Sequence, residues 1–410
     1  MAPAGSFESL RAAIVGGADS VYFGVGRLNM RSRSSQNFTL NDLNEIVSIC
    51  REARVKCYVT LNTVVFDQEL DEMKSVADAC KLAGVDAVIA SDAAVLSYLS
   101  SVKVPIHIST QCNITNLEAV KFYSLFADVM VLARELSLDQ MAEIAKGVER
   151  DQVKGPSGQL VRLEVFAHGA LCMATSGKCY LSLDNLNSSA NRGACLQVCR
   201  RPYKVTDTDG EVELVVDNEY IMSPKDLCTL PFLDQLVGAG MSVLKIEGRG
   251  RSAEYVKMVT KVYKEAVEAI RLGHFTQENK QTWMNQLSTV YNRGFWGGYY
   301  LGQSMGEWSA GYGSQATRRK LYIGKVTNYF GNLSVAEIKV ETNSIKPGDV
   351  LIFNGPTTGS YEQEVAEVRL EYDPVPEAKK GSLCSVATSS IVRRSDKVYK
   401  WIESSDEEIS

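Results

Sequence analysis

Residues 39–62 read TLNDLNEIVSICREARVKCYVTLN, and the alternation within this stretch decides the fold class. In the first half, Thr39 and Asn41 supply polar side chains that begin helices, and apolar residues follow at the spacing of one helix face. Those apolar residues are Leu40, Leu43, Ile46, Val47 and Cys50. In the second half, Lys56 to Asn62 (KCYVTLN) is a short apolar run typical of a buried strand. An amphipathic helix next to a buried strand predicts a repeated β/α unit.

The same alternation continues over the first 275 residues or so. The six further strand candidates are 20–24 (SVYFG), 86–90 (DAVIA), 105–110 (PIHIST), 128–133 (DVMVLA), 162–167 (RLEVFA) and 242–247 (SVLKIE). The opening residues MAPAG make an eighth strand candidate. Eight such units predict an α/β fold, a (β/α)₈ barrel of the TIM type over residues 1–275.

A doubly wound open sheet is the structural alternative. Gly24-Val25-Gly26 follows a strand as a dinucleotide-binding turn does. The third glycine of that fingerprint is missing, however, and the next residues, RLNMRSR, form a polar stretch. We therefore interpret this segment as a loop between a strand and a helix.

The alternation breaks after residue 169. Residues from about 170 to 225 are rich in Cys, Asn, Ser and Gly, and we expect them to form an insertion on the loop side of the barrel. Within it, Asp207-Thr208-Asp209-Gly210 separates the strand candidates Tyr203 to Thr206 and Val212 to Val216, which is a hairpin pattern. A helix is predicted to begin near Asp226.

The last third of the chain has a different pattern. Residues 276–317 read as a helical connector that ends in a Gly- and aromatic-rich stretch. The strand candidates that follow are Leu321 to Val326, Ser334 to Val340, Asp349 to Phe353 and Ser382 to Ala387. They predict a small C-terminal β-barrel module over residues 318–402, and residues 403–410 read as a solvated acidic tail.

The composition limits the class of protein. The chain has 410 residues, of which 45% are hydrophobic, and a net charge of −5. This excludes a disordered chain and predicts well-filled cores. No run of about eighteen apolar residues is present, and the first residues lack the basic and apolar parts of a signal peptide. We therefore expect a cytoplasmic protein without membrane spans. The mild acidity argues only against a uniformly basic coat.

In a reducing compartment, ten cysteines are better interpreted as core residues, metal ligands or reactive thiols than as five disulfides. Cys50, Cys57, Cys80 and Cys384 stand alone in apolar patterns, where a free cysteine behaves as a small buried hydrophobe. Cys112 lies just past a strand end, and its role is open.

A second group of cysteines is dense. It follows the pattern C-x6-C-x15-C-x3-C and consists of Cys172, Cys179, Cys195 and Cys199. Four thiolates from a loop can hold zinc or a 4Fe-4S cluster, and gaps of six and fifteen residues fit structural zinc sites poorly. Two disulfides are the remaining alternative. Cys228 either replaces one ligand or is a core thiol at a helix start.

The chemistry of a (β/α)₈ barrel lies at the carboxyl ends of its strands. The polar residues at those predicted ends are Asn62, Asp92, Gln111, Arg134, Glu135, His168, Glu247 and Arg249. The cysteine loop begins just after His168, so a bound cluster would cap the barrel mouth.

Several side chains at or near these strand ends have more than one interpretation. His168 is an acid/base or proton-relay candidate, or it forms a hydrogen bond to the cysteine loop. Arg134 and Glu135 either belong to an active site or form an ion pair across the rim. Arg31, Arg33, Arg249 and Arg251 offer guanidinium groups to a phosphate or a dicarboxylate donor, or they are exposed loop charges.

The residues around the cysteines also form a signature. Residues 164–172 read EVFAHGALC and residues 176–182 read SGKCYLS. Together with further motifs in the same order, this signature resembles the peptidase U32 family, also called collagenase-like proteases, over most of residues 1–302. The further motifs are APAG (2–5), GADSVY (17–22), STQ (109–111), LARELS (132–137), NRG (191–193), SPKDL (223–227) and KIEGR (245–249).

The resemblance implies RNA hydroxylation rather than proteolysis. Similar members make 5-hydroxyuridine at the tRNA wobble position through prephenate-linked metabolism, or hydroxylate a cytidine of large-subunit ribosomal RNA. A further branch hydroxylates ubiquinone precursors without oxygen and binds a 4Fe-4S cluster through its cysteines. A single barrel with one C-terminal β module resembles the tRNA branch.

The resemblance also implies site residues. The first three family ligands match Cys172, Cys179 and Cys195, and both Cys199 and Cys228 are open for the fourth. The catalytic candidates, taken from the predicted strand ends and the motifs around them, are His168, Glu164, Arg134 and Glu247. The substrate-binding candidates are Arg31, Arg33, Asn62, Gln111, Lys245 and Arg249.

A peptidase is the main alternative, since the family carries that name. The chain has no H-E-x-x-H, and residues 302–306 (GQSMG) match G-x-S-x-G without the strand and helix that a nucleophile elbow needs. We therefore predict an oxygen-independent tRNA hydroxylase with a 4Fe-4S cluster, or zinc as the alternative, and prephenate as a candidate co-substrate. An rRNA cytidine hydroxylase and a non-catalytic RNA-binding barrel are further alternatives.

Overall fold

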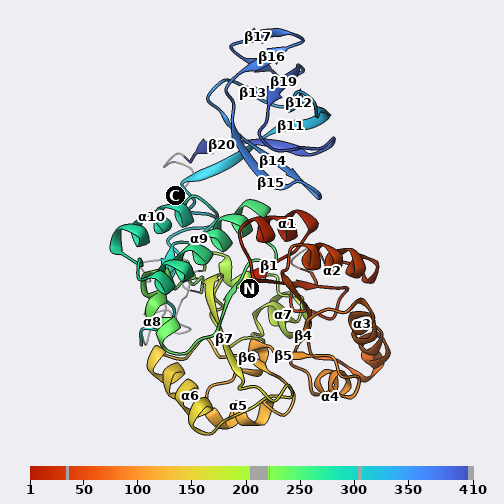
Figure 1. Cartoon of the computed structure of the whole chain (residues 1–410). Coiled ribbons are helices and arrows are strands. Elements are labelled where there is room, and N and C mark those ends of the chain that lie inside the picture. The colour runs from red at the N-terminus through yellow and green to blue at the C-terminus, as the bar shows by residue number, and fades with distance from the viewer. Residues whose placement is uncertain (34–36, 204–219, 221, 303–306, 405–410) are drawn as a thin grey trace, which may run out of the picture.

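The structure is a computed structural model that describes residues 1–33, 37–203, 220, 222–302 and 307–404. It has two parts: strands surrounded by helices, and an antiparallel sheet that lies beyond one side of that body (Figure 1). The predicted hairpin after Tyr203, most of GQSMG and most of the acidic tail lie outside the described residues.

A ten-stranded, largely parallel sheet forms the centre of the first part. Its strands follow the order β1-β2-β3-β4-β5-β6-β7-β8-β10, and β9 also pairs with β7. The β7–β8 pair is antiparallel. The strands are β1 (Ala2–Pro3), β2 (Ser20–Gly24), β3 (Lys56–Leu61), β4 (Ala87–Ala90), β5 (Ile106–Ile108), β6 (Val129–Val131), β7 (Arg162–Gly169), β8 (Asp226–Cys228), β9 (Val243–Ile246) and β10 (Phe295–Trp296).

Each of the eight predicted strand segments contains a strand, namely β1 to β7 and β9. Two hydrogen bonds link β9 to the first residue: Ile246 N–H donates to the Met1 carbonyl at 3.0 Å, and the Met1 ammonium donates to the Leu244 carbonyl at 2.8 Å. The pairings of the described strands include no β1–β9 ladder. The α/β class with a parallel sheet is confirmed, and closure into an eight-stranded barrel stays a prediction.

Along the chain, helices alternate with most of the strands, and most of these helices surround the sheet (Figure 1). They are α1 (Phe7–Val15), α2 (Leu43–Glu52), α3 (Leu70–Ala83), α4 (Ala93–Ser101), α5 (Leu117–Tyr123), α6 (Leu138–Arg150), α7 (Leu181–Leu186), α8 (Leu233–Gly238), α9 (Ala253–Leu272) and α10 (Gln277–Ser288). Short 3₁₀ helices span Leu40–Asp42, Asp67–Glu69, Thr110–Cys112, Ala190–Arg192, Val198–Arg200 and Leu230–Phe232.

Helix α2 shows how the predicted pattern is used. Leu43, Ile46, Val47 and Cys50 are buried, as the helical spacing predicts. Leu40 lies in the preceding 3₁₀ turn and is 40% exposed. The turn is closed by the Asp42 carboxylate, which accepts the backbone N–H of Thr39 at 2.7 Å.

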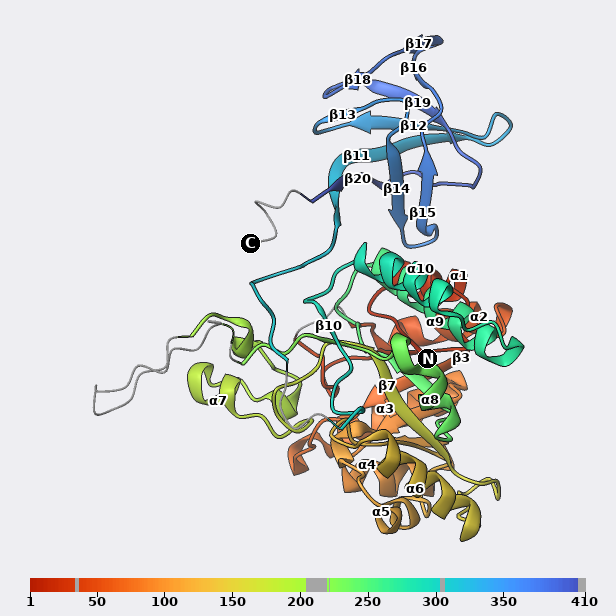
Figure 2. The ribbon, with the colours of Figure 1, turned by 90° about the vertical axis from the view of Figure 1, so that its left-hand side faces the viewer.

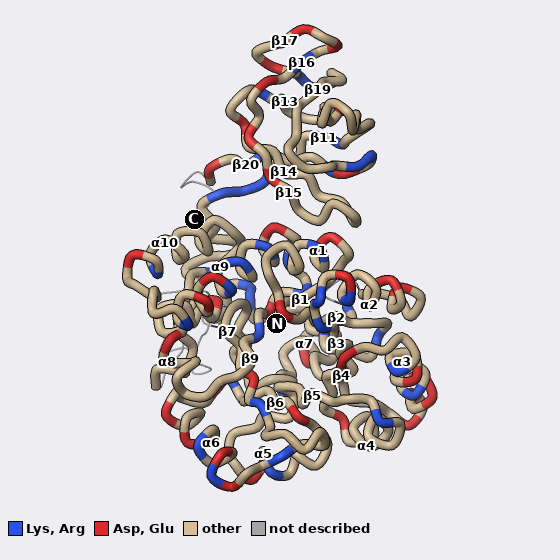
Figure 3. The backbone as a smooth tube through the Cα atoms, viewed as in Figure 1, with Lys and Arg blue, Asp and Glu red and all other residues tan. Residues whose placement is uncertain are grey.

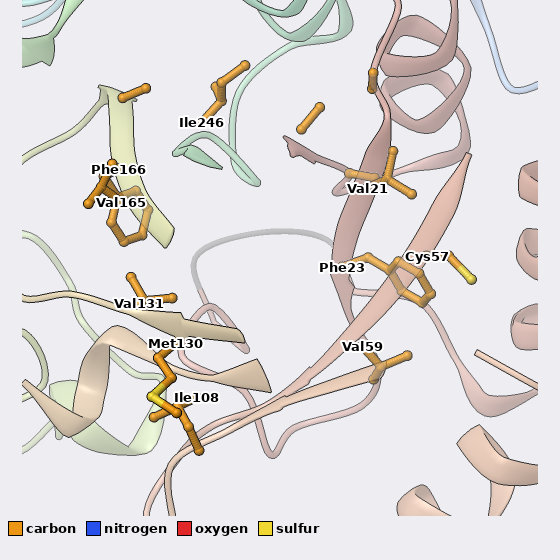
Figure 4. Close-up of a cluster of buried hydrophobic side chains, with 14 of the residues drawn as sticks. Val21, Phe23, Cys57, Val59, Ile108, Met130, Val131, Val165, Phe166 and Ile246 are labelled. Atoms are coloured by element: carbon orange, nitrogen blue, oxygen red, sulfur yellow. The ribbon is translucent and has the colours of Figure 1, made fainter. Parts of the chain in front are cut away.

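The main hydrophobic core lies between the strands and these helices. Its members run from Ala2 to Tyr300. Figure 4 shows a part of it, where Val21 and Phe23 of β2 lie near their strand neighbours Cys57 and Val59 of β3. Cys50, Cys57 and Cys80 belong to this core, which confirms their interpretation as buried hydrophobes.

The prediction of a helix near Asp226 is wrong, because residues 226–228 form strand β8. Asp226 is buried, and its carboxylate accepts a hydrogen bond from Arg293 Nη1 at 3.1 Å. The adjacent backbone is held extended by pairing with β10, a strand in the stretch that the sequence pattern assigns to the connector. The helix begins only at Leu233.

The second part of the molecule is an antiparallel sheet in the order β15-β14-β20-β11-β12-β19-β16-β17, with β13 and β18 paired separately. Its strands are β11 (Arg318–Phe330), β12 (Val335–Val340), β13 (Ser344–Ile345), β14 (Val350–Gly355), β15 (Gly359–Glu364), β16 (Val368–Leu370), β17 (Asp373–Val375), β18 (Ala378–Lys379), β19 (Leu383–Ala387) and β20 (Lys397–Glu403). The four strand candidates of this region are confirmed as β11, β12, β14 and β19. Its closure as a barrel stays a prediction.

This sheet has its own core, which includes Cys384, and packs on the helices of the first part. Arg11 of α1 donates to the Pro356 carbonyl at 2.8 Å, and Lys257 of α9 donates to the Ser360 carbonyl at 3.0 Å. Lys320 of β11 forms an ion pair with Glu254 of α9. Figure 2 shows the sheet above α1, α9 and α10, whereas α7 projects from another side of the body.

Charged residues of both signs are interspersed along the helices and the C-terminal sheet (Figure 3), as expected for a net charge of only −5. No helix within the described ranges is both long enough and apolar enough to cross a bilayer.

Candidate functional site

A cavity of about 150 Å³ lies at the carboxyl ends of the parallel strands, with the cysteine-rich insertion forming one of its walls. The predicted site residues that line it are Arg31, Asn62, Gln111, Arg134, Lys245, Glu247, Arg249, Cys172, Cys179, Cys195 and Cys199. With Arg200, five cationic side chains face a single carboxylate among the lining residues. The cavity therefore favours anionic groups.

Arg31 and Glu247 form an ion pair at this cavity. Arg31 Nη2 and Nε donate to Glu247 Oε1 at 2.6 and 3.1 Å, and the Tyr22 hydroxyl donates to Glu247 Oε2 at 3.3 Å. Burial alone would raise the pKa of Glu247, but the charges of Arg31 and Arg249 and the Arg31 hydrogen bond lower it to about 2. At neutral pH Glu247 is therefore a carboxylate that accepts hydrogen bonds.

Arg249 is held by neutral groups. Its Nη1 atom donates to Asn29 Oδ1 at 3.0 Å and to Thr60 Oγ1 at 2.9 Å, and the residue is only 5% exposed. Burial lowers the pKa of Arg249 to about 10. A Cβ atom at Gly24 would lie 2.5 Å from Arg249 Nη1, so a larger residue at this position would require the Arg249 side chain to move.

Lys245 and Glu164 form a buried ion pair on neighbouring strands β9 and β7. The Lys245 Nζ atom lies 2.8 Å from Glu164 Oε1, and the side chains are 6% and 0% exposed. Lys245 lines the cavity and Glu164 does not. The pair holds the ammonium group at the cavity wall, and removal of either partner would leave a buried charge without its counterion.

Two guanidinium groups hold the start of the cysteine loop. Arg134 donates to the Ala170 carbonyl at 3.2 Å, to Ser176 Oγ at 2.8 Å and to Cys172 Sγ at 3.8 Å. Arg200 Nη2 donates to the Leu171 carbonyl at 2.6 Å. Arg134 thus contacts the loop, and the predicted alternative, a rim ion pair with Glu135, is not among the ion pairs of the described residues.

A third arginine attaches the insertion to the loop that follows β3. Arg192 Nη1 donates to Glu69 Oε2 at 2.6 Å, and its guanidinium carbon lies 4.2 Å from the centroid of the Phe66 ring. Glu69 is buried, and the Arg192 hydrogen bond is the main cause that lowers its pKa to about 2. The insertion is therefore tied to the strand body by a buried ion pair as well as by Arg134.

Four of the ten cysteines line the cavity and six do not. All ten are free thiols. Cys172, Cys179, Cys195 and Cys199 line the cavity and are exposed or half-buried. Cys228 is buried in β8, with its Sγ atom 3.8 Å from both Tyr263 Oη and Met284 Sδ.

The four cavity thiols fit an iron–sulfur cluster or zinc by donor type, because both take thiolate ligands. Throughout the described residues, however, no three side chains of His, Cys, Asp or Glu are close enough to chelate an ion. Their convergence on a metal centre therefore stays a prediction.

His168 does not line the cavity, although strict alternation along β7 would place it on the same face as Glu164 and Phe166. The register between β7 and β9 shifts between Phe166 and His168, so a β-bulge or another irregularity interrupts the alternation there. The imidazole instead lies among the rings of Tyr255, Tyr263 and Phe295, and burial lowers its pKa to about 3.

Arg33 is also separate from the cavity. It is exposed and lines a different groove. Tyr22 and Thr60 are among the cavity residues that are absent from the set that the sequence predicts. The period of two would have found Thr60, since it lies on β3 two positions before Asn62, which directly follows that strand.

Comparison with known proteins shows which family and which relatives the chain is similar to. The sequence profile of peptidase family U32 matches residues 5–310. A Porphyromonas gingivalis protein named "Collagenase" is 54% identical over 401 residues, which cover 98% of this chain and 97% of that protein.

Two further relatives carry names from RNA modification. The Bacillus subtilis "tRNA hydroxylation protein P1" is 30% identical over 376 residues, 90% of this chain and 86% of that protein. An Escherichia coli 23S rRNA 5-hydroxycytidine synthase is 38% identical over 274 residues, 66% of this chain and 39% of that protein.

Proposed function

The chain belongs to peptidase family U32, and on that premise we propose that it is an RNA hydroxylase that forms 5-hydroxyuridine at the wobble position of tRNA. Relatives named for tRNA and rRNA hydroxylation support an RNA-modifying enzyme at the level of the family. Beyond this, we propose that the substrate is tRNA and that the modified position is the wobble position.

One observation carries this proposal: the cavity has four thiols and five cations around a space of about 150 Å³. A cavity of this size holds one benzene-sized ring. It therefore suits a single pyrimidine taken out of the base stack, as enzymes that modify bases require.

We propose that Cys172, Cys179, Cys195 and Cys199 hold a 4Fe-4S cluster. When bound, such a cluster supplies electron transfer or a Lewis acid to the reaction. Arg134 and Arg200 would hold the loop that carries the first ligand, since they donate to the Leu171 and Ala170 carbonyls and to Cys172 Sγ.

The remaining side chains would bind and orient the substrates. Lys245 and Arg249 present buried positive charges to the cavity, which suits a carboxylate or phosphate group of a substrate. Asn62 donates to Ser109 and accepts from the Met30 backbone, so its amide is fixed as a wall of the cavity. Gln111 Oε1 has no partner within the described chain and would accept a hydrogen bond from the base.

Proteolysis is the second candidate, and the relative named "Collagenase" at 54% identity favours it. The positions of the three histidines oppose a His-dependent peptidase at this cavity. His107 and His168 are buried outside the cavity lining, and His274 is exposed beyond α9. A peptidase at this cavity would therefore need another base.

Nucleoside mass spectrometry of tRNA and rRNA from a deletion strain and a complemented strain tests the proposal. We expect 5-hydroxyuridine and its derivatives to disappear from tRNA and to return with the gene. Loss of an rRNA hydroxycytidine instead would favour the ribosomal alternative. Unchanged RNA together with cleavage of denatured collagen by the purified protein would favour the peptidase.

A further inference from the structure

A groove of about 330 Å³, distinct from the one that Arg33 lines, lies directly beside the cavity. It shares four lining residues with the cavity, namely Met30, Asn62, Gln111 and Gly177. Its other walls come from the loops after β3 and β4 and from the cysteine-rich insertion. A polymer with one unit in the cavity would therefore place its next unit in this groove.

Two buried polar atoms at this groove have no hydrogen-bond partner within the described residues. They are Thr63 Oγ1 and Gln111 Oε1. Thr63 is only 2% exposed. Buried polar groups in native structures are normally paired, so these atoms indicate a missing partner such as a ligand or an ordered water.

An aromatic ring and a positive charge stand at the groove. Tyr180 is 69% exposed, and Lys178 lies two positions before it on the insertion. The acidic side chain at this groove, Asp92, is occupied, since its carboxylate accepts the backbone N–H groups of Val65 and Ala94 at 3.1 and 2.9 Å. It also caps the N-terminus of α4, where a negative charge is stabilised.

We propose that this groove is the subsite for the nucleotide next to the modified base. Tyr180 stacks on the neighbouring base, Lys178 contacts its phosphate, and Thr63 forms a hydrogen bond to its ribose or base. Stacking on an exposed aromatic ring combined with a nearby cation is the usual mode of single-stranded RNA binding. The inference rests on the proposed function, because it takes an RNA strand as the substrate.

Binding of a fluorescent RNA hairpin with a uridine in its loop tests the subsite. The full-length proteins are wild type, Tyr180→Ala, Lys178→Gln and, as a matched control, Tyr372→Ala, whose side chain is 88% exposed on the C-terminal sheet. We expect Tyr180→Ala to weaken binding by about 10-fold or more. Lys178→Gln should weaken binding and lower its salt dependence. Tyr372→Ala should bind like wild type, and thermal unfolding should show that all four proteins are folded.

Abasic hairpins separate stacking from a general loss of affinity. If Tyr180 stacks on a neighbouring base, removing that base on the correct side of the uridine weakens wild-type binding but does not weaken Tyr180→Ala further. Equal binding by wild type and Tyr180→Ala would overturn the subsite while leaving the proposed function intact. A wild-type protein that binds no RNA would overturn both. Tyr180-dependent binding of a collagen peptide in place of RNA would assign the groove to a peptide.

Discussion

Arg31 and Glu247 are 216 positions apart in the chain, yet Arg31 Nη2 and Glu247 Oε1 lie 2.6 Å from each other at the cavity. The pair joins the loop after β2 to the residue that follows β9, so it connects the beginning and the end of the parallel strands. It also reduces the positive charge of the cavity wall, because Glu247 is the single carboxylate among the lining residues.

We expect Glu247→Gln to change the acid stability of the protein. The pKa of Glu247 is lowered from its ordinary value of 4.5 to about 2, so its stabilising effect is complete above pH 4.5 and is lost as the pH falls towards 2. The effect corresponds to about 3 kcal/mol in the free energy of unfolding. Urea unfolding between pH 2 and 6 should show a flatter pH dependence for Glu247→Gln. Asp71→Asn, which removes a fully exposed carboxylate, is the matched control.

His168→Gln should also reduce the sensitivity to acid. Burial lowers the pKa of His168 to about 3, so between pH 6.5 and 3 the unfolded chain binds a proton that the folded protein does not. Wild type therefore loses up to about 5 kcal/mol of stability over this range, and the variant does not. His274→Gln is the control, because His274 is exposed. A steeper pH dependence in His168→Gln than in wild type would contradict this role.

Single Cys→Ser variants should separate the cavity thiols from Cys228. Serine at position 172, 179, 195 or 199 is expected to remove most of the bound iron and the broad visible absorption of anaerobically purified protein. Cys228→Ser should keep both, since Cys228 is buried against Tyr263 and Met284. Loss of iron in Cys228→Ser would make it a ligand, and a colourless wild type with one zinc would refute the iron–sulfur cluster.

Gly24→Ala should displace Arg249. The added Cβ would lie 2.5 Å from Arg249 Nη1 and 2.4 Å from Asn37 Oδ1, and neither contact is tolerated without movement. We expect a loss of about 1–3 kcal/mol in the free energy of unfolding, as for other overpacked sites. Gly238→Ala is the matched control, because a Cβ atom added there would have no neighbour within 4 Å and the backbone at Gly238 is helical. An equal effect of both substitutions would show that the Arg249 contact is unimportant.

The sequence by itself determined the positions of eight of the ten strands of the first part and of four of the ten strands of the second part. The eight strand segments of the first part and four strands of the C-terminal sheet are where the apolar patterns predict them. Such patterns are local, since a strand or helix face repeats every two or three to four residues whatever lies elsewhere in the chain. The grouping of Cys172, Cys179, Cys195 and Cys199 was also visible in the spacing alone.

Only the tertiary structure decided which side chains meet. The register of β7 shifts just before His168, which lies outside the cavity lining, and no local pattern marked that shift. Asp226 begins a strand rather than a helix because its backbone pairs with β10, which is distant in the chain, and Arg293 binds its buried carboxylate. Cys228 is separated from the cavity thiols by its place in β8. Strand register and long-range ion pairs decide these positions, and both depend on residues distant in the chain.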